Sequence, residues 1–235
     1  MWDGAINHID MQALAPISHP KEMNSSIIGV VNKLNKNQFY RNLFFRAFND
    51  SAITGTKILK ALSQFQLTLV SDQSKYDKVK NGNDSFSKQE KNGYALFKKN
   101  CNNCHSEPLF STYDFKHNGL KGDPYLKDYG RWNITKNKKD SMLFKTPSLR
   151  NLSYTFPYMH DGRFNTLYQV LDHYTTIQKE NPLISNELKE SIVLTENQKT
   201  DLVAFLLTLN DKKFVTNKNF QFPAKVFSKI KGTIN

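Results

Sequence analysis

CNNCH occupies positions 101–105, so that Cys101 and Cys104 are three positions apart and His105 follows directly. Two cysteines and a histidine in this order form the attachment pattern of a c-type haem. The spacing has a chemical reason. The two sulfurs form thioethers with the two vinyl groups on one haem edge, and the adjacent imidazole then lies beneath the iron as its proximal ligand. The motif therefore predicts one covalently bound haem, with electron transfer at its iron as the expected chemistry.

Other uses of paired cysteines are less consistent with this sequence. The chain has two cysteines, and both lie in this motif. A structural zinc site takes about four protein ligands, and the sequence offers no second pair. A thioredoxin-like redox motif would lie near a β-α-β pattern, which the apolar residues do not show. A disulfide or a chance match are the remaining alternatives.

Apolar residues recur at helical spacing along much of the chain. Two of the expected helices begin with a capping box, SKQE at Ser87 and TENQ at Thr195. The first of these helices ends where Cys101 begins the motif, so the haem would be attached at the end of a rigid element. The spacing predicts helices over the ranges 54–71, 87–100, 166–176 and 195–209, with further helices near 25–34 and 37–48.

The segments between these ranges are rich in glycine, asparagine, aspartate and proline. KNGNDS at 80–85 has the composition of a linker, and 110–148 shows few periodic signals. No convincing alternation indicates a sheet. The sequence therefore predicts a mainly α fold with long ordered loops. Loops of this length are unusual unless they have a function, and a haem is an object that they could surround.

The chain has 235 residues, enough for one large domain or two small ones. Its 33 basic and 21 acidic residues give a formal net charge of +12. The lysines are scattered rather than interleaved with aromatics, which disfavours binding of single-stranded nucleic acid and favours a solvated surface that docks acidic partners. No stretch approaches the ~20 apolar residues of a membrane span, and MWDGAINHIDMQ lacks the features of a signal peptide.

Several longer segments resemble one protein family. FKTPSLRNLSYTFPYMHDGRFNTLYQVLDHY at 144–174 resembles the C-terminal haem domain of bacterial di-haem cytochrome c peroxidases, a family that includes the tryptophan-modifying enzymes that mature methylamine dehydrogenase. WDGAINHIDMQALAPISHPKEM at 2–23, SQFQLTLVSDQSKYDK at 63–78 and the predicted helix at 195–209 are also similar to the family. The resemblance covers nearly the whole chain, and its motifs agree in order and spacing.

The resemblance implies cytochrome-c-like domains with one haem each. It divides the chain into 1–80, a remnant of the N-terminal peroxidatic haem domain with linking helices, 81–215, the C-terminal haem domain, and 216–235, an extension. In the family one haem reacts with peroxide and the other relays electrons from a small c-type cytochrome. The CNNCH haem would be the relay. The family has another CxxCH before its WDG segment, so we expect this chain to be truncated.

The resemblance also assigns catalytic residues. Trp2 matches the tryptophan that lies between the two haems. Gln12 and Glu22 match residues over the peroxide-reacting iron, where Glu22 would move a proton between the peroxide oxygens and Gln12 would orient the bound molecule. Considered alone, Glu22 could instead cap the helix that follows it, and Trp2 could be a packed aromatic.

The far ligand of the relay haem is open between two residues. Tyr174 matches the ligand position as in the tryptophan-modifying branch, whereas classical members use methionine there. Met159 is the rival, because it offers a soft thioether sulfur close to the same motif. A core tyrosine is the plain alternative for Tyr174. For His160 we expect a structural role near the haem–haem interface.

Calcium is a further implication of the resemblance. Thr155 and Pro157 match positions whose backbone carbonyls bind a calcium ion between domains, and carbonyl oxygens suit this hard cation. A third family ligand, an asparagine, would lie upstream of this chain.

The main hypothesis is a cytochrome-c peroxidase that reduces hydrogen peroxide to water in the periplasm, where haem c is normally attached. A single-haem electron-transfer cytochrome and a di-haem enzyme that oxidises a protein side chain are the alternatives. The expected partners are a small c-type cytochrome as electron donor and, as in some relatives, a second copy of the chain.

Overall fold

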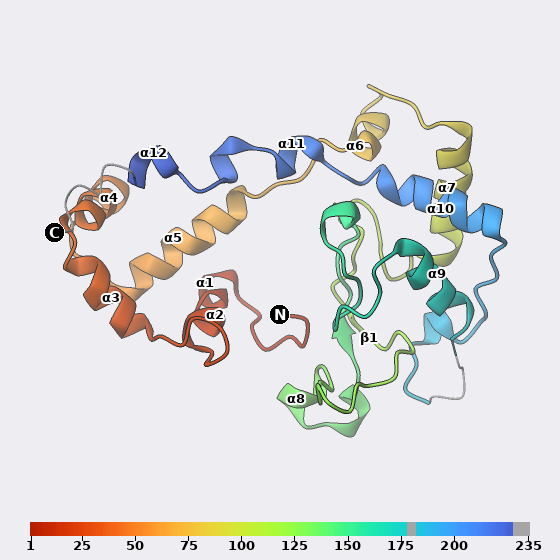
Figure 1. Cartoon of the computed structure of the whole chain (residues 1–235), viewed down its shortest axis with the longest axis horizontal. Helices are drawn as coiled ribbons and strands as arrows, with labels where there is room; N and C mark the ends of the chain where they lie inside the picture. The colour runs from red at the N-terminus through yellow and green to blue at the C-terminus, as the bar shows by residue number, and fades with distance from the viewer. Residues whose placement is uncertain (178–181, 228–235) are drawn as a thin grey trace. The chain divides into compact units, whose positions relative to one another are not determined.

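The computed structural model describes residues 1–177 and 182–227. The chain forms two compact units. The motif unit comprises Met1–Ala5 and Ser71–Val215 and contains CNNCH, and the helical unit comprises Ile6–Val70 and the residues from Thr216 onward. Helices dominate both units in the described residues, which confirms the predicted mainly α fold (Figure 1). No helix in these ranges has the length and apolar character needed to cross a membrane.

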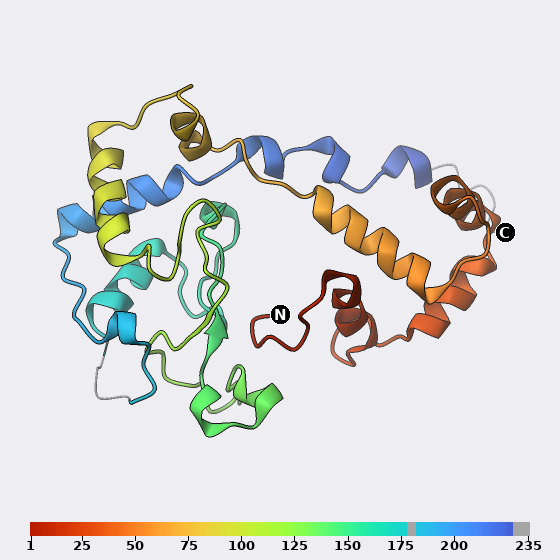
Figure 2. The ribbon, with the colours of Figure 1, turned by 180° about the vertical axis from the view of Figure 1, so that it is seen from behind.

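Two crossing helices build the centre of the motif unit. α7 (Lys88–Asn100) and α10 (Glu196–Leu207) cross in both views of the ribbon (Figures 1 and 2). Gly93 permits this close approach, since a Cβ atom there would lie 1.9 Å from the carbonyl oxygen of Asp201. Both predicted capping boxes are present, so these two helices begin where the sequence indicated.

An aromatic core fills the space beside the crossing. Phe97, Phe110 and Phe205 are fully buried, and the rings of Phe97 and Phe205 have centroids 5.1 Å apart. Tyr76 packs edge-on against Phe110 at 4.7 Å. Burying each such side chain contributes about 2–3 kcal/mol, so this cluster is the main apolar stabilisation of the motif unit.

Two more helices pack on this centre. α6 (Lys75–Lys80) starts at a capping box between Ser74 and Asp77, and α9 (Leu167–Thr175) starts at one between Thr166 and Gln169. Helix α6 was not predicted from the sequence. It belongs to the motif unit because the Tyr76 N–H donates to the carbonyl of Thr208 at 3.0 Å.

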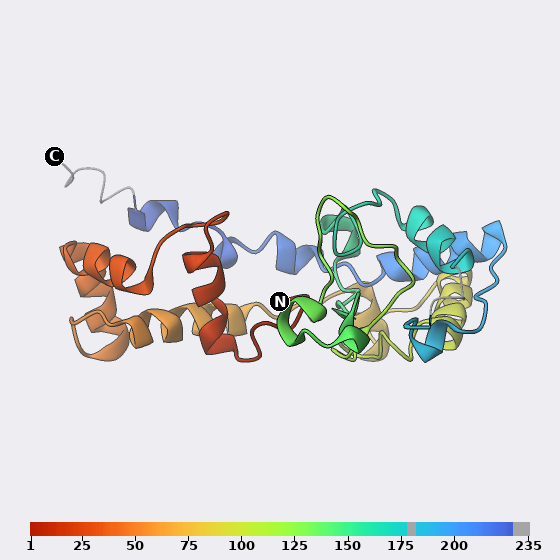
Figure 3. The ribbon, with the colours of Figure 1, turned by 90° about the horizontal axis from the view of Figure 1, so that it is seen from below.

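The predicted long loops connect α7 to α9. Figure 3 shows them as the green segments of the motif unit. Among the described residues they contain two short strands, β1 (Phe115–Lys116) and β2 (Phe144–Lys145), paired antiparallel. This small pairing is an addition to the prediction, which contained no sheet. The short helical segments of the unit are α8 (Trp132–Thr135), η1 (Lys138–Asp140), η2 (Leu152–Tyr154), η3 (Asn186–Leu188) and α11 (Lys212–Val215).

The helical unit forms around fewer buried side chains. Its predicted helices are confirmed as α3 (Ile27–Asn35), α4 (Gln38–Phe48) and α5 (Gly55–Thr68). Asn35 links α3 to the segment that precedes α5, because its side-chain amide donates a hydrogen bond to the carbonyl of Ile53 at 2.8 Å. The remaining segments are α1 (Ile9–Gln12), α2 (Leu14–Ser18), η4 (Lys218–Phe220) and α12 (Ala224–Phe227).

The boundaries between the two units differ from the domain boundaries that the resemblance implied. The division falls at residues 70/71 rather than 80/81, and the residues from Thr216 group with the helical unit. The KNGNDS segment therefore follows α6 inside the motif unit instead of joining two units. Asp77 explains this placement, because it accepts two hydrogen bonds from Arg150, at 2.9 and 2.8 Å, in the same unit. The assignment of 1–80 to a second haem domain stays a prediction.

Candidate haem site

The CNNCH motif forms a tight turn at the end of α7. The Cys101 N–H donates to the Phe97 carbonyl at 2.8 Å, and the His105 N–H donates to the Cys101 carbonyl at 2.9 Å. Both cysteines are free thiols. Burial raises the pKa of Cys101 to about 12 and also raises the pKa of Cys104.

The described residues contain no group of three or more His, Cys, Asp or Glu side chains that could hold a metal ion. The geometry of the described residues therefore disfavours a zinc site at the motif. Two free thiols with a histidine directly after the second fit the attachment of a c-type haem.

His105 is oriented by two backbone carbonyls. Its Nδ1 lies 3.2 Å from the oxygen of Phe110 and 3.1 Å from that of Pro147. A carbonyl oxygen only accepts, so Nδ1 carries the proton and Nε2 keeps its lone pair. Burial also lowers the pKa of His105, which favours the neutral ring. Carbonyls that hold one ring nitrogen in this way fix the tautomer of a metal-binding histidine, so the residues present fit a haem iron.

Tyr174 and Met159 share one neighbour, Asn118. The Asn118 amide nitrogen lies 3.4 Å from the Met159 sulfur, and Asn118 acts to lower the pKa of the Tyr174 phenol, against the larger effect of burial. Burial, with the nearby thiols of Cys101 and Cys104, raises the pKa of Tyr174 to about 12. The structure thus places Tyr174 near the motif thiols and Met159 beside Asn118, and the choice between the two as far ligand stays a prediction.

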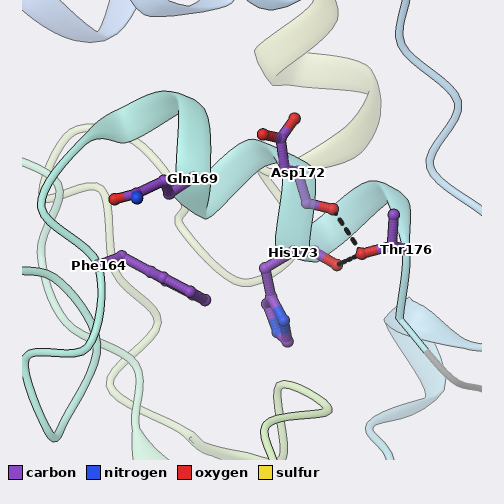
Figure 4. Close-up of a pocket in the computed structure, with 5 residues that line it drawn as sticks. All are labelled: Phe164, Gln169, Asp172, His173 and Thr176. Carbon is purple, nitrogen blue, oxygen red and sulfur yellow. Dashed lines mark hydrogen bonds between the residues drawn. The ribbon is translucent and has the colours of Figure 1, made fainter.

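A shallow pocket lies on another part of α9. Figure 4 shows His173 and Phe164 side by side, with ring centroids 5.8 Å apart. The Thr176 hydroxyl donates to the carbonyls of Asp172 and His173 and ends the helix. Since Tyr174 is not part of its lining, we do not place the haem there. The lining residues are Phe164, Gln169, Asp172, His173 and Thr176.

His160 has the contacts of a structural residue. Its ring stacks on Phe144 with centroids 3.8 Å apart and planes 15° apart, and its Nε2 lies 3.9 Å from a carboxylate oxygen of Asp161. Asp161 is bound by Arg163, which also donates to the Lys121 carbonyl at 3.0 Å. Burial lowers the pKa of His160 and favours a neutral ring. These contacts are consistent with the expected structural role, while its place at a haem–haem interface stays a prediction.

The predicted calcium residues follow η2 on one loop. Thr155 donates its N–H to the Leu152 carbonyl at 3.2 Å, and Pro157 follows a cis peptide bond. Two backbone carbonyls supply only part of the roughly six to eight oxygens that calcium takes. The calcium site stays a prediction that needs oxygens from elsewhere in an intact protein.

The predicted catalytic residues have separate surroundings. Gln12 accepts a hydrogen bond from Gln66 at 3.0 Å, and the exposed Glu22 lies 3.8 Å from an imidazole nitrogen of His19. Trp2 belongs to the motif unit, where its carbonyl accepts the Lys145 N–H at 2.7 Å. The role of these three residues in peroxide chemistry stays a prediction.

Sequence analysis missed two residues that arrange the site. Phe110 provides a carbonyl to His105 and has a left-handed φ of 55°. Asn118 contacts Met159, one of the two candidate far ligands. The Asn-Gly pair at 118–119 is a turn signal, but nothing in the sequence shows what the turn lies against.

Comparison with known proteins places the chain in a family. Residues 1–85 match the family model for di-haem cytochrome c peroxidase. The chain is 36% identical to the methylamine utilization protein MauG of Methylophilus methylotrophus, with 89% of this chain and 63% of the relative covered. It is 39% identical to MauG of Methylorubrum extorquens, with 88% and 60% covered.

The chain is also 33% identical to the cytochrome c551 peroxidase of Nitrosomonas europaea, with 88% of the chain and 60% of that protein covered. It thus spans 60–63% of the length of these three relatives.

Solved structures agree with this assignment. A MauG-like protein associated with microbial copper homeostasis superposes with a TM-score of 0.82 at 29% identity, over 94% of this chain and 76% of that one. The diheme peroxidase BthA from Burkholderia thailandensis E264 gives a TM-score of 0.74 at 19% identity, over 92% and 66%, which shows a shared fold. The chain belongs to the di-haem cytochrome c peroxidase family.

Proposed function

We propose that this chain is the electron-relay part of a di-haem cytochrome-c peroxidase. The observation that carries the proposal is the arrangement of His105, whose Nδ1 is held by two carbonyls so that Nε2 keeps its lone pair, directly after two free cysteines in the motif. A haem c bound at Cys101, Cys104 and His105 would supply one-electron redox chemistry. It would receive electrons from a small c-type cytochrome in the periplasm and pass them toward the peroxide site.

The polypeptide would serve this relay in three ways. The thiols of Cys101 and Cys104 would tether the haem, and α7 would hold the tether because its last turn continues into the motif. The neutral ring of His105 would present Nε2 to the iron. Tyr174, or Met159 as the rival, would be the second protein ligand of the haem, and a phenolate ligand would lower the reduction potential where a thioether ligand would raise it.

Peroxide would be reduced at a second haem, which another part of the intact protein would carry, since one haem uses both cysteines of this chain. Two electrons and two protons convert one hydrogen peroxide into two waters. Glu22 would hold and return a proton at the peroxide oxygens, Gln12 would orient the molecule, and Trp2 would lie on the route between the haems. A calcium ion at Thr155 and Pro157 is part of the same proposal.

Oxidation of a protein side chain is the second candidate function. The identity to the MauG proteins, 36% and 39%, exceeds the 33% to the cytochrome c551 peroxidase. Tyr174 at the far-ligand position also matches the tryptophan-modifying branch. A single-haem carrier without catalysis is the third candidate, supported by the single attachment motif in this sequence.

The test is turnover by the protein in its intact, haem-loaded form. A relay peroxidase oxidises a reduced small c-type cytochrome when peroxide is added, and Glu22→Gln lowers kcat by about 100-fold or more, as expected for loss of an acid–base group. Glu196→Gln, which removes an exposed carboxylate that pairs with Lys199, is the matched control and leaves kcat unchanged. Peroxide-dependent oxidation of a protein substrate, with no oxidation of the cytochrome, would contradict the peroxidase proposal and support the second candidate.

A further inference from the structure

The loop between β1 and β2 presents a cluster of apolar side chains to solvent. Tyr125 is 93% exposed, and Leu126, Tyr129 and Ile134 are 40–59% exposed. The ring of Trp132 in α8 forms a T-shaped pair with that of Tyr129, with centroids 5.3 Å apart. This part of the motif unit lies away from the crossing of α7 and α10 (Figures 1 and 2). Exposed tyrosine and aliphatic side chains gathered in this way are typical of a protein-binding surface.

Lysines surround the apolar cluster. Residues 121–139 include six basic and two acidic side chains. Both acids are used within the loop, since Asp123 accepts the Tyr125 N–H at 2.7 Å and Asp128 accepts the Gly130 N–H at 3.0 Å. Among the described residues, the ion pairs of lysine with carboxylates form elsewhere. The exposed lysines of the loop are Lys121, Lys127, Lys136, Lys138 and Lys139.

The five lysines and the four exposed apolar side chains together form the loop surface, whose chemistry fits the acidic face of a protein. Lysines without carboxylate partners attract a negatively charged molecule, whereas a second copy of this chain, with a formal net charge of +12, would be repelled. Single-stranded nucleic acid stacks its bases on free aromatic faces. The face of Trp132 is already engaged, because the Lys136 ammonium lies 4.5 Å from its ring centroid.

A short run of chain connects the loop surface to the haem ligand. The Arg131 N–H donates to the Leu143 carbonyl at 2.8 Å. The chain then passes through β2 to Pro147, whose carbonyl lies 3.1 Å from Nδ1 of His105. A protein bound at the loop surface is therefore linked to His105 through residues 143–147.

We propose that the loop surface docks the acidic face of the small c-type cytochrome that donates electrons. In each transfer the donor loses one electron and the haem at CNNCH gains one. The apolar cluster supplies the buried centre of the contact, and the lysines steer the encounter. The inference rests on the proposed relay function.

The test measures binding of one basic small c-type cytochrome in two forms to the intact, haem-loaded protein. One form is unmodified, and the other has its surface lysines succinylated, which replaces positive charges by negative ones. Calorimetry with both proteins oxidised follows binding without electron transfer. The succinylated form should bind about 10-fold more tightly or better at about 10 mM salt, and the preference should disappear near ~1 M salt, where charges are screened beyond about 3 Å.

A charge-reversal variant of the loop surface should lose this preference. Lys121→Glu combined with Lys138→Glu and Lys139→Glu should weaken binding of the succinylated form by about 10-fold or more at low salt. Reduction of the haem by the reduced succinylated cytochrome, followed by stopped-flow absorbance, should slow by a similar factor. Tyr125→Ala should weaken binding about fivefold with little dependence on salt, as expected for an apolar contact at the centre of an interface.

A matched variant separates the loop surface from net charge. Lys88→Glu combined with Lys91→Glu and Lys189→Glu makes the same change in charge at exposed positions elsewhere in the motif unit. It should change the Kd by less than about threefold, since charges far from an interface act only through the long-range field.

Three results would overturn the inference. The charge-reversal variant could bind as the parent does, the two triple variants could weaken binding equally, or the parent could sediment as a dimer that the charge-reversal variant dissociates, which would assign the surface to a second copy. A parent that binds the succinylated cytochrome without accepting electrons from it would instead contradict the proposed relay function, on which the inference rests.

Discussion

The two units of this chain differ in how their helices are stabilised. In the motif unit, the helices bury a connected set of aromatic rings, among them Phe97 and Phe205 with no exposed surface. In the helical unit α3 and α5 also have side-chain N-caps, at Ser26 and Thr54, yet large apolar side chains remain exposed. Among them are Ile28, Phe45, Phe65, Leu67 and Val70. Caps determine where a helix begins, whereas buried apolar surface provides most of its stability.

The largest expected difference between the units is the cost of removing a phenylalanine. Phe97→Ala should lower the free energy of unfolding of the motif unit by about 3–5 kcal/mol, because it leaves a cavity among buried rings. Phe65→Ala, at a side chain that is 47% exposed, should cost well under half as much. Urea unfolding followed by circular dichroism measures both, and equal losses would show that the contrast in burial does not govern stability.

Acid should weaken the motif unit through Asp77. Burial alone would raise the pKa of this carboxyl, but hydrogen bonds from Arg150 and Ser74 outweigh it, so the pKa lies below its ordinary value. A lowered folded-state pKa contributes stability that is complete above the unfolded-state pKa of about 4 and is lost as the pH falls toward the folded-state value.

Asp77→Asn should therefore lower the free energy of unfolding by about 3 kcal/mol at pH 7, and the difference from the parent should shrink below pH 4. Asp50→Asn tests the same change at an exposed pair with Lys57, where a much smaller loss is expected. Unfolding curves from pH 3 to pH 7 measure this difference in the free energy of unfolding. A difference that stays constant across that range would contradict the predicted dependence on the Asp77 carboxylate.

A glycine-to-alanine change should lower the free energy of unfolding in the motif unit but not in the helical unit. Gly93→Ala forces α7 and α10 apart, since the new Cβ atom would meet a backbone carbonyl, and should cost about 1–3 kcal/mol. Gly29→Ala, where the nearest atom is 3.2 Å away on the side chain of Ser26, should be neutral or stabilise α3 by up to ~1 kcal/mol through helix propensity. Thermal unfolding of both variants measures the signs, and a destabilising Gly29→Ala as large as Gly93→Ala would contradict this account.

Helix caps should show the smallest difference. Ser87→Ala removes the cap of α7 and Ser26→Ala removes that of α3, with hydrogen bonds of 3.2 and 3.0 Å to the helix N–H groups. Each change should cost about 1 kcal/mol. Similar losses by urea unfolding would confirm that local signals act alike in both units, and a loss at Ser87 several times that at Ser26 would show that the cap also supports the core.

Local signals made the long helices predictable. Capping boxes and apolar spacing predicted α7 and α10 from the sequence, because these signals involve residues within a few positions of one another. The same kind of box at Ser74 was overlooked, and α6 was missed, because the KNGNDS segment that follows suggested a linker. The backbone hydrogen bond from Tyr76 to Thr208 holds α6 in the motif unit. It joins residues that are far apart in sequence, so local patterns do not reveal it.

The candidate site was predictable only where residues are adjacent in sequence. Cys101, Cys104 and His105 form one pentapeptide, so their chemistry follows from spacing alone. The contact of Asn118 with Met159 spans 41 positions, and that of His105 with Pro147 spans 42. Such contacts depend on how loops pack on α9 and α7, which spacing does not reveal.

The covalent attachment of one haem at CNNCH is the claim on which the proposed relay depends. Its most direct test is the intact mass of the chain produced in a host that exports it and attaches haem c. The account predicts a mass greater than the polypeptide by one haem, and loss of that increment in the variant that combines Cys101→Ala with Cys104→Ala. A colourless protein with the mass of the bare polypeptide would contradict it.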